Sequence, residues 1–182
     1  MKRNHTMTWQ KLSTKTVYDN PWMTVKEDAV INPAGGQNQY GHVHFKNRAV
    51  AIVPLDATNQ LWLVGQTRYT LGAYSWELPM GGAPLSEPPL DAAKRELREE
   101  TGLTAASWTE IMRLHPSNSI TDEVGIAYLA RDLTAGPTAH EDTEDITVKQ
   151  CSLTESLAMI DRGEITDAIS VATLLQVARQ HA

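Results

Sequence analysis

The segment GGAPLSEPPLDAAKRELREETGL, residues 81–103, limits the possible folds of this chain more than any other stretch. From Leu90 to Leu97 its apolar residues recur at spacings of three and four, which places them on one face of a helix. Gly102 stands where a residue of left-handed conformation commonly closes a helix. The sequence therefore predicts a helix over residues 90–101 that buries one apolar face.

The charged residues of this helix are segregated rather than interleaved. Glu96 lies one helical turn from Glu99 and Glu100, and such like-charged neighbours cost about 0.2–0.5 kcal/mol each in an isolated helix. A hard cation explains this acidic edge, because Mg²⁺ prefers oxygen ligands and can bridge to the phosphate oxygens of a substrate. Arg95 is the oppositely charged neighbour of Glu99, so we expect it to hold that carboxylate in position.

The rest of the chain alternates short strands with helices. Residues 49–56 and 60–69 are rich in Val, Ile and Leu, which is typical of neighbouring strands in a buried sheet. The order of elements predicts an α/β fold, a sandwich built on a mixed sheet. The other predicted elements are two strands within 14–30 around an Asn20-Pro21 turn, strands at 40–45, 74–79, 107–115, 123–133 and 146–153, a loop at 80–89, a helix capped by Thr154 and ended by Gly163, and a helix at 166–180.

Composition and charge exclude several classes of protein. Hydrophobic content of 41% and charged content of 21% are ordinary for a folded globular domain. The formal net charge of -6 argues against a protein that binds the nucleic-acid backbone. No apolar run approaches the roughly 18 residues of a membrane span, and the single cysteine, Cys151, rules out an internal disulfide. We expect a cytoplasmic protein with no nucleic-acid or membrane partner.

Nine residues match every fixed position of a known pattern, G-x5-E-x7-R-E-U-x-E-E-x-G-U, in which U is a bulky aliphatic residue. They are Gly81, Glu87, Arg95, Glu96, Leu97, Glu99, Glu100, Gly102 and Leu103. This pattern is the Nudix box, and on these residues the chain resembles the Nudix hydrolase family. The resemblance implies an α/β/α sandwich with a mixed sheet. It also implies that water attacks one phosphorus of a nucleoside diphosphate linked to another moiety, with Mg²⁺ or Mn²⁺ as cofactor.

The same resemblance implies roles for individual residues of the box. The metal ligands would be the carboxylates of Glu96, Glu99 and Glu100, joined by the backbone carbonyl of Met80 just ahead of the box. Glu87 and Arg95 would support these ligands.

The segments on either side of the box bear on the substrate. GQTRYTLGAYSWELPMGG resembles the segment ahead of the box in ADP-ribose pyrophosphatases and related nucleoside-diphosphate-sugar hydrolases, which implies that Arg68 contacts substrate phosphates and that Glu77 lies near the metals. PSNSITDEVGIAYLA resembles a loop of the same group, with Glu123 as its acid. Where many of these enzymes carry a proline beyond the box, this chain has Asn118 or Ser119. The substrate therefore stays open among ADP-ribose, ADP-glucose and GDP-mannose types.

Two further regions take their expected roles from the resemblance. The general base in these relatives is often a glutamate on a late acidic loop, here HEDTEDITV, with Glu144 as the first candidate and Glu141 and Asp142 as alternatives. Residues 1–45 would be a strand extension that builds a homodimer and helps to stack the base, with Tyr18 and Trp22 as candidates. Residues 46–182 would form the Nudix domain.

Two alternatives to a sugar-nucleotide hydrolase follow from the sequence. The first is a Nudix pyrophosphohydrolase that acts on nucleoside triphosphates, dinucleoside polyphosphates or capped RNA. The second is a Nudix domain that binds a nucleotide as a sensor without hydrolysing it. The sensor class usually lacks box carboxylates, and this chain has all of them.

Overall fold

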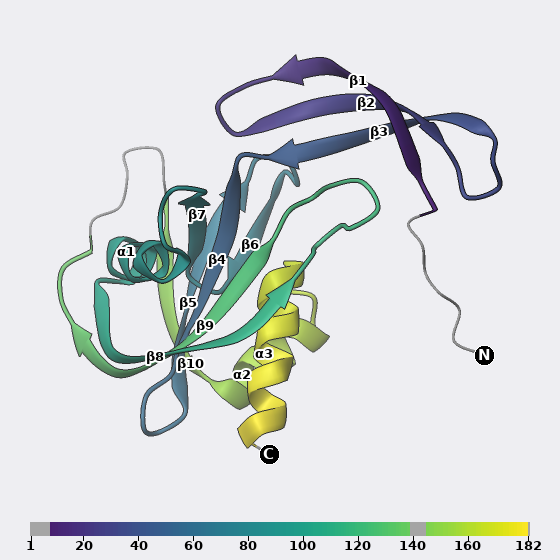
Figure 1. Cartoon of the computed structure of the whole chain (residues 1–182). Coiled ribbons are helices and arrows are strands. Elements are labelled where there is room, and N and C mark those ends of the chain that lie inside the picture. The colour runs from purple at the N-terminus through teal and green to yellow at the C-terminus, as the bar shows by residue number, and fades with distance from the viewer. Residues whose placement is uncertain (1–7, 139–144, 182) are drawn as a thin grey trace. The chain divides into compact units, whose positions relative to one another are not determined.

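The computed structural model describes residues 8–138 and 145–181 of the chain (Figure 1). These residues form two compact units. The first contains residues 8–47 together with Ser117–Glu123, and the second contains Arg48–Pro116 and residues 124–138 and 145–181.

The first unit is an antiparallel sheet in the order β1-β2-β3. Its strands are β1 (Gln10–Asp19), β2 (Met23–Ile31) and β3 (Gln37–Phe45). The turn predicted at Asn20-Pro21 is confirmed, because the side-chain oxygen of Asn20 accepts hydrogen bonds from the backbone N–H groups of Trp22 and Met23. A side-chain acceptor of this kind closes a turn between two strands.

The segment Ser117–Glu123 is far along the chain from β3 but belongs to the same unit. Val43 exchanges backbone hydrogen bonds with it, donating to Ile120 at 2.8 Å and accepting from Asp122 at 3.2 Å. The Asp122 carboxylate also bonds to the ring of His44 and accepts from the backbone N–H of Phe45.

The second unit contains two sheets, in the orders β7-β4-β9-β8 and β10-β5-β6. Strands β4 and β9 run parallel, while β8 with β9 and β5 with both of its neighbours run antiparallel, so the unit is mixed as predicted. Its elements are β4 (Asn47–Pro54), β5 (Gln60–Arg68), β6 (Ala73–Glu77), β7 (Met80–Pro84), α1 (Pro89–Thr101), β8 (Leu103–Leu114), β9 (Gly125–Ala135), β10 (Thr147–Ser152), α2 (Leu153–Asp161) and α3 (Ala168–His181).

Strand β4 is buried on both faces, and its alternating side chains enter two different cores. Val50 and Ile52 pack in the cluster that includes Leu97 of α1, whereas Val53, and Leu55 directly after the strand, pack in the cluster of α2 and α3. Successive side chains of a strand point to opposite faces, so helices must cover both. Helix α1 accordingly lies on one side of this sheet and α3 on the other (Figure 1), which confirms the predicted α/β/α sandwich.

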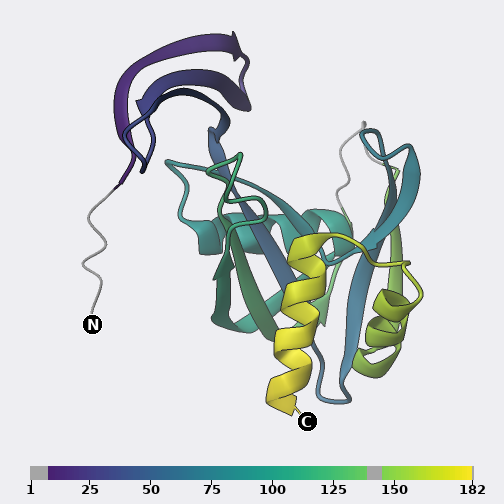
Figure 2. The same cartoon turned by 90° about the vertical axis from the view of Figure 1, so that its right-hand side faces the viewer.

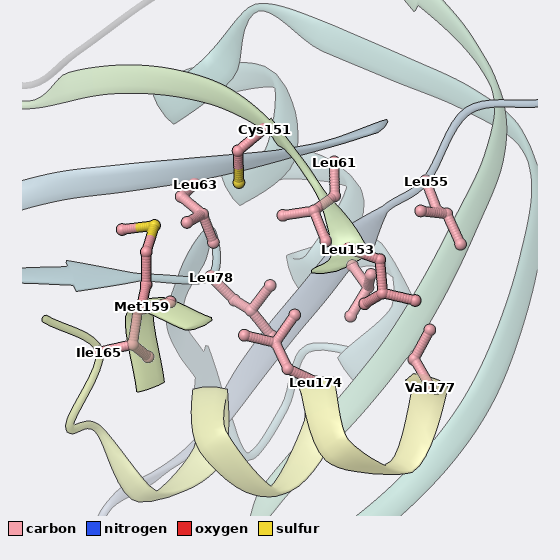
Figure 3. Packing of buried hydrophobic residues seen from close by; sticks show 11 residues of the cluster. Leu55, Leu61, Leu63, Leu78, Cys151, Leu153, Met159, Ile165, Leu174 and Val177 are labelled. Carbon is pink, nitrogen blue, oxygen red and sulfur yellow. The ribbon is translucent and has the colours of Figure 1, made fainter. Parts of the chain in front are cut away.

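The second cluster fixes α3 to the sheet. Leu174 and Val177 point from α3 into a group of fully buried leucines that includes Leu78, which follows β6 directly (Figure 3). Helix α2 contacts both β10 and α3, and both helices lie at the yellow-green end of the colour scale in Figure 2. This packing positions residues 166–170 beside the end of β6, which matters for the site below.

Two local predictions were wrong. Residues 80–84 form strand β7 rather than loop, because sheet pairing beside β4 outweighs the low strand propensity of two glycines. Helix α2 is capped by Ser152, whose hydroxyl accepts from the N–H of Glu155 at 3.1 Å, rather than by Thr154. Within residues 8–138 and 145–181, no helix is long and apolar enough to cross a membrane.

Candidate active site

The predicted acidic helix packs directly over β7. A side chain at Gly81 would overlap the carboxylate of Glu96. Glycine inside a strand often marks such a close approach, so Gly81 is required by the position of Glu96. Gly102 closes the helix at φ 71°, the left-handed conformation that its position predicted.

Arg95 lies at the centre of the box and bonds to several acids at once. Its Nη1 donates to Glu96 at 2.7 Å and to Glu99 at 3.1 Å. Its Nη2 donates to the carbonyl of Gly82 at 3.0 Å and to Glu87 at 3.4 Å. Burial alone would lower the pKa of the Arg95 guanidinium, but Glu87, Glu96 and Glu99 more than offset this and raise it. The expected Arg95–Glu99 contact is present, and Arg95 also bonds to Glu96 and Glu87.

Glu100 has a different setting from the other acids of α1. It is only 3% exposed, and its Oε2 accepts a hydrogen bond from the backbone N–H of Met80 at 2.9 Å. This bond ties the end of α1 to the first residue of β7. The predicted ligands Glu100 and Met80 are therefore neighbours in the structure.

The donor chemistry of this group suits a hard cation. Glu96, Glu99 and Glu100 offer carboxylate oxygens, which Mg²⁺ and Mn²⁺ prefer to nitrogen or sulfur. Across the two described ranges, no three His, Cys, Asp or Glu side chains converge on one point. Glu96 and Glu99 instead accept hydrogen bonds from Arg95, and Glu100 accepts one from the backbone N–H of Met80.

Arg68 and Glu77, predicted separately, form one ion pair. Arg68 Nε donates to Glu77 Oε1 at 2.9 Å, and its Nη2 donates to Oε2. Glu77 is 3% exposed, so its charge is enclosed and depends on this two-point contact. Hydrogen bonding to Glu77 raises the pKa of the Arg68 guanidinium, and Glu100 adds to the effect.

A pocket of about 380 Å³ opens beside this ion pair. It falls within the size range of sites for small ligands. The described residues that line it come from the β5–β6 hairpin, from β7 and from the start of α3, and are Arg68, Thr70, Leu71, Ser75, Glu77, Met80, Thr166 and Asp167.

Sequence reasoning missed five residues of this pocket: Thr70, Leu71, Ser75, Thr166 and Asp167. Asp167 has a local signal, because it precedes α3 and its Oδ2 accepts from the N–H of Ser170 at 2.7 Å, as a helix cap does. That signal predicts a helix start and says nothing about a pocket near Arg68. Only the packing of α3 brings the two together.

Three predicted substrate residues lie in the first unit. Tyr18 is on β1 and 53% exposed, and Trp22 is in the turn after it and 67% exposed. Glu123 ends the segment that pairs with β3 and is half-buried. The candidate bases Glu141, Asp142 and Glu144 lie outside the described residues.

Comparison with known proteins matches nearly the whole chain. The NUDIX domain matches residues 45–174, and the nucleoside diphosphate sugar hydrolase N-terminal domain matches residues 9–43. The chain is 35% identical over 173 residues to an ADP-ribose pyrophosphatase of Mycobacterium tuberculosis, spanning 93% of this chain and 83% of that protein. It is 32% identical over 122 residues to an ADP-ribose pyrophosphatase of Bacillus subtilis, 66% of each chain.

A solved structure described as an ADP compounds hydrolase has the same fold. Its TM-score is 0.85, and the match covers 95% of this chain and 94% of that one. The sequence identity is 22%, so this likeness supports the fold alone.

Proposed function

The chain belongs to the Nudix family and is a Nudix pyrophosphohydrolase, and on this premise we propose that it hydrolyses nucleoside diphosphate sugars. The products are a nucleoside monophosphate and a sugar phosphate, and ADP-ribose is the first substrate to test. The observation that carries this proposal is the order of the two matched domains. A nucleoside diphosphate sugar hydrolase N-terminal domain at 9–43 directly precedes the NUDIX domain at 45–174.

We propose that the oxygen-rich group around α1 holds Mg²⁺ or Mn²⁺. Glu96, Glu99, Glu100 and the carbonyl of Met80 would be its ligands, with Glu87 and Arg95 supporting them. A divalent cation bound there supplies neutralisation of the diphosphate charge and polarisation of its phosphorus–oxygen bonds. Without the cation, Arg95 holds the neighbouring carboxylates in place through its bonds to Glu96 and Glu99.

Arg68 contacts the diphosphate in this proposal. Glu77 occupies two of the five N–H donors of its guanidinium, which leaves donors for phosphate oxygens. Such charge-assisted bonds are about twice as strong as neutral ones. They also stabilise the negative charge that develops on the leaving phosphate as the bond between the attacked phosphorus and the bridging oxygen breaks.

The attacking water needs a base. An acid of residues 141–144 takes its proton while the water oxygen bonds to phosphorus, with Glu144 as the first candidate and Glu141 and Asp142 as alternatives. Glu123, the acid of the loop at 117–123, would contact the substrate in this proposal. The measurement that separates the three candidate bases is kcat for Glu144→Gln, Glu141→Gln and Asp142→Asn. Removal of the base lowers kcat more than it changes KM.

We propose that the first unit joins two copies of the chain into a homodimer. All of β1 is exposed, and Tyr18 and Trp22 present large rings there that would pack in the dimer or stack on the base. Sedimentation velocity tests this, and a monomer at micromolar concentration contradicts it. For location we propose the cytoplasm, where the buried, unpaired Cys151 would stay reduced.

A phosphatase-coupled screen tests the substrate class. ADP-ribose, ADP-glucose, GDP-mannose, UDP-glucose and nucleoside triphosphates are each incubated with the protein and Mg²⁺, with excess EDTA as the metal-free control. We expect phosphate release from sugar nucleotides in Mg²⁺ and none in EDTA. Release from triphosphates alone would overturn the proposal, and binding without any release would favour the nucleotide sensor.

A further inference from the structure

The pocket beside Arg68 has a lining that distinguishes the two halves of a sugar nucleotide. It lies wholly within the second unit. Its geometry follows from the register of the β5–β6 hairpin, in which Gln66 opposes Ser75 and Arg68 opposes Ala73. Opposed residues of an antiparallel pair share a face, and so do alternate residues along a strand. Arg68, Ser75 and Glu77 are therefore on one face.

Ser75 is the small residue on the hairpin face that carries the ion pair. It stands between Ala73 and Glu77 on that face and is 4% exposed. Its small side chain leaves room for Arg68 to extend along the hairpin to Glu77. The guanidinium is then fixed along one edge, and its remaining donors are available on the pocket side.

Aromatic rings are directed away from this face. Tyr74 and Trp76 alternate with Ser75 and Glu77, so they lie on the opposite face of the hairpin, where their rings pack edge to face at 5.5 Å. Among the described lining residues none is aromatic; instead three carry hydroxyls, namely Thr70, Ser75 and Thr166. A nucleobase favours a flat apolar or aromatic surface, whereas sugar hydroxyls favour carboxylates and hydroxyls as hydrogen-bond partners.

Asp167, which lines the pocket just ahead of α3, is held in place by hydrogen bonds. One of its carboxylate oxygens caps α3 through the N–H of Ser170. The hydroxyl of Ser170, which is fully buried, accepts from the N–H of Leu78 at 3.0 Å. Leu78 follows Glu77 directly, so these bonds fix Asp167 relative to the Arg68–Glu77 pair, and the second oxygen of Asp167 can accept from a ligand.

We propose that this pocket binds the sugar phosphate half of the substrate, with Arg68 on the phosphate and Asp167 accepting hydrogen bonds from sugar hydroxyls. The inference rests on the proposed function and assigns its specificity to residues that the box does not contain. Asp167 is then a substrate-binding residue that discriminates sugars by the positions of their hydroxyls.

Binding of the two half-products tests this without turnover. Dissociation constants for ribose 5-phosphate and AMP are measured by calorimetry in Mg²⁺ for the full chain and for Asp167→Asn and Asp167→Ser. Both substitutions keep a side-chain oxygen to cap α3. Asp167→Asn replaces the oxygen that accepts from the sugar with an NH₂ donor. Asp167→Ser has a shorter side chain with a single oxygen, which cannot both cap α3 and contact the sugar. Asp161→Asn, an exposed acid at the end of α2, is the matched control.

We expect both variants to bind ribose 5-phosphate about tenfold more weakly and AMP no more weakly than the unsubstituted protein. Loss of a negative charge alone would tighten both anions, so selective weakening identifies a lost hydrogen bond. Equal weakening of AMP, no change for either ligand, or no binding of ribose 5-phosphate to the unsubstituted protein would overturn the inference. Hydrolysis of ADP-ribose, assayed in parallel, reports separately on the proposed function.

Discussion

Arg95 and Arg68 both donate hydrogen bonds to glutamates of the second unit, but Arg95 bonds to several carboxylates and Arg68 to only one. Arg95 donates to three carboxylates and to the Gly82 carbonyl, so acceptors surround its guanidinium. Arg68 donates to the single carboxylate of Glu77 and also faces a pocket.

The difference teaches which partner organises the other. Arg95 gathers acids that repel one another on one edge of α1, and a bound cation can take over that neutralisation. Arg68 is instead positioned by its partner. The enclosed carboxylate of Glu77 binds one edge of the Arg68 guanidinium and leaves the other edge for a ligand. The five predictions below separate these two roles, from the largest expected effect to the smallest.

The largest effect is expected at Glu100, the acid of α1 that bonds to Met80. Glu100→Gln keeps the volume and an oxygen for that bond but removes the charge that a cation requires. We expect kcat for ADP-ribose in Mg²⁺ to fall more than about 1000-fold with little change in Tm. Glu155→Gln, on the exposed surface of α2, should retain full turnover. Undiminished hydrolysis by Glu100→Gln would remove this residue from the metal site.

Loss of Arg68 is expected to affect both activity and stability. Arg68→Ala should lower kcat/KM about 100-fold, as expected for lost charge-assisted bonds to phosphate. It should also lower the free energy of unfolding by about 3–5 kcal/mol, because the enclosed carboxylate of Glu77 loses its ion-pair partner. In urea denaturation, adding Glu77→Gln to this variant should recover stability but not activity. Wild-type stability of Arg68→Ala would show that the pair does not hold the hairpin.

Arg95→Ala provides the opposite case, since a cation can compensate for it. Without metal, the repulsion among the acids of α1 is no longer offset, and Tm should fall by a few degrees. Addition of Mg²⁺ should raise the Tm of this variant by more than that of the unsubstituted chain. The same Mg²⁺ titration should not restore the stability that Arg68→Ala loses. Equal Mg²⁺ responses from the two variants would contradict the distinction.

The pH dependence follows from the raised pKa of both arginines. A cation whose folded pKa is raised contributes its full stabilisation below the unfolded pKa and loses it only as the pH rises through the still higher folded pKa. Neither arginine therefore causes stability or kcat/KM to fall between pH 7 and about 11. Arg68→Lys introduces a group that titrates near about 10.4, so the ratio of its kcat/KM to that of the unsubstituted enzyme should fall above that pH. A constant ratio across this range would contradict the phosphate role of Arg68.

The smallest effect is expected at Glu87, which makes the longest of the bonds to Arg95, at 3.4 Å. Glu87→Gln keeps an oxygen at this position, and Arg95 retains its two acids on α1. We expect kcat/KM to fall by less than about fivefold, in line with partly exposed ion pairs. A larger loss in steady-state kinetics would move Glu87 from a supporting role into the metal site.

The sequence predicted α1 well because its signals are local. Apolar spacing, the acidic edge and Gly102 all lie within one turn or two of the residues that they describe. The strand at 80–84 was missed for the opposite reason. Its two glycines are unfavourable locally, and the first of them is required by the Glu96 carboxylate, which packs over Gly81 from α1.

The sequence by itself determined the family, the sandwich fold and the acids of the box, because repeating patterns and fixed spacings are written along the chain. Only the tertiary structure decided that Arg68 pairs with Glu77, that Asp167 faces the same pocket, and that residues 117–123 join the sheet of the first unit. The physical reason is that each of these depends on the register of strands and on the packing of α3. Register and packing are set by contacts between residues far apart in sequence, and no local pattern carries them.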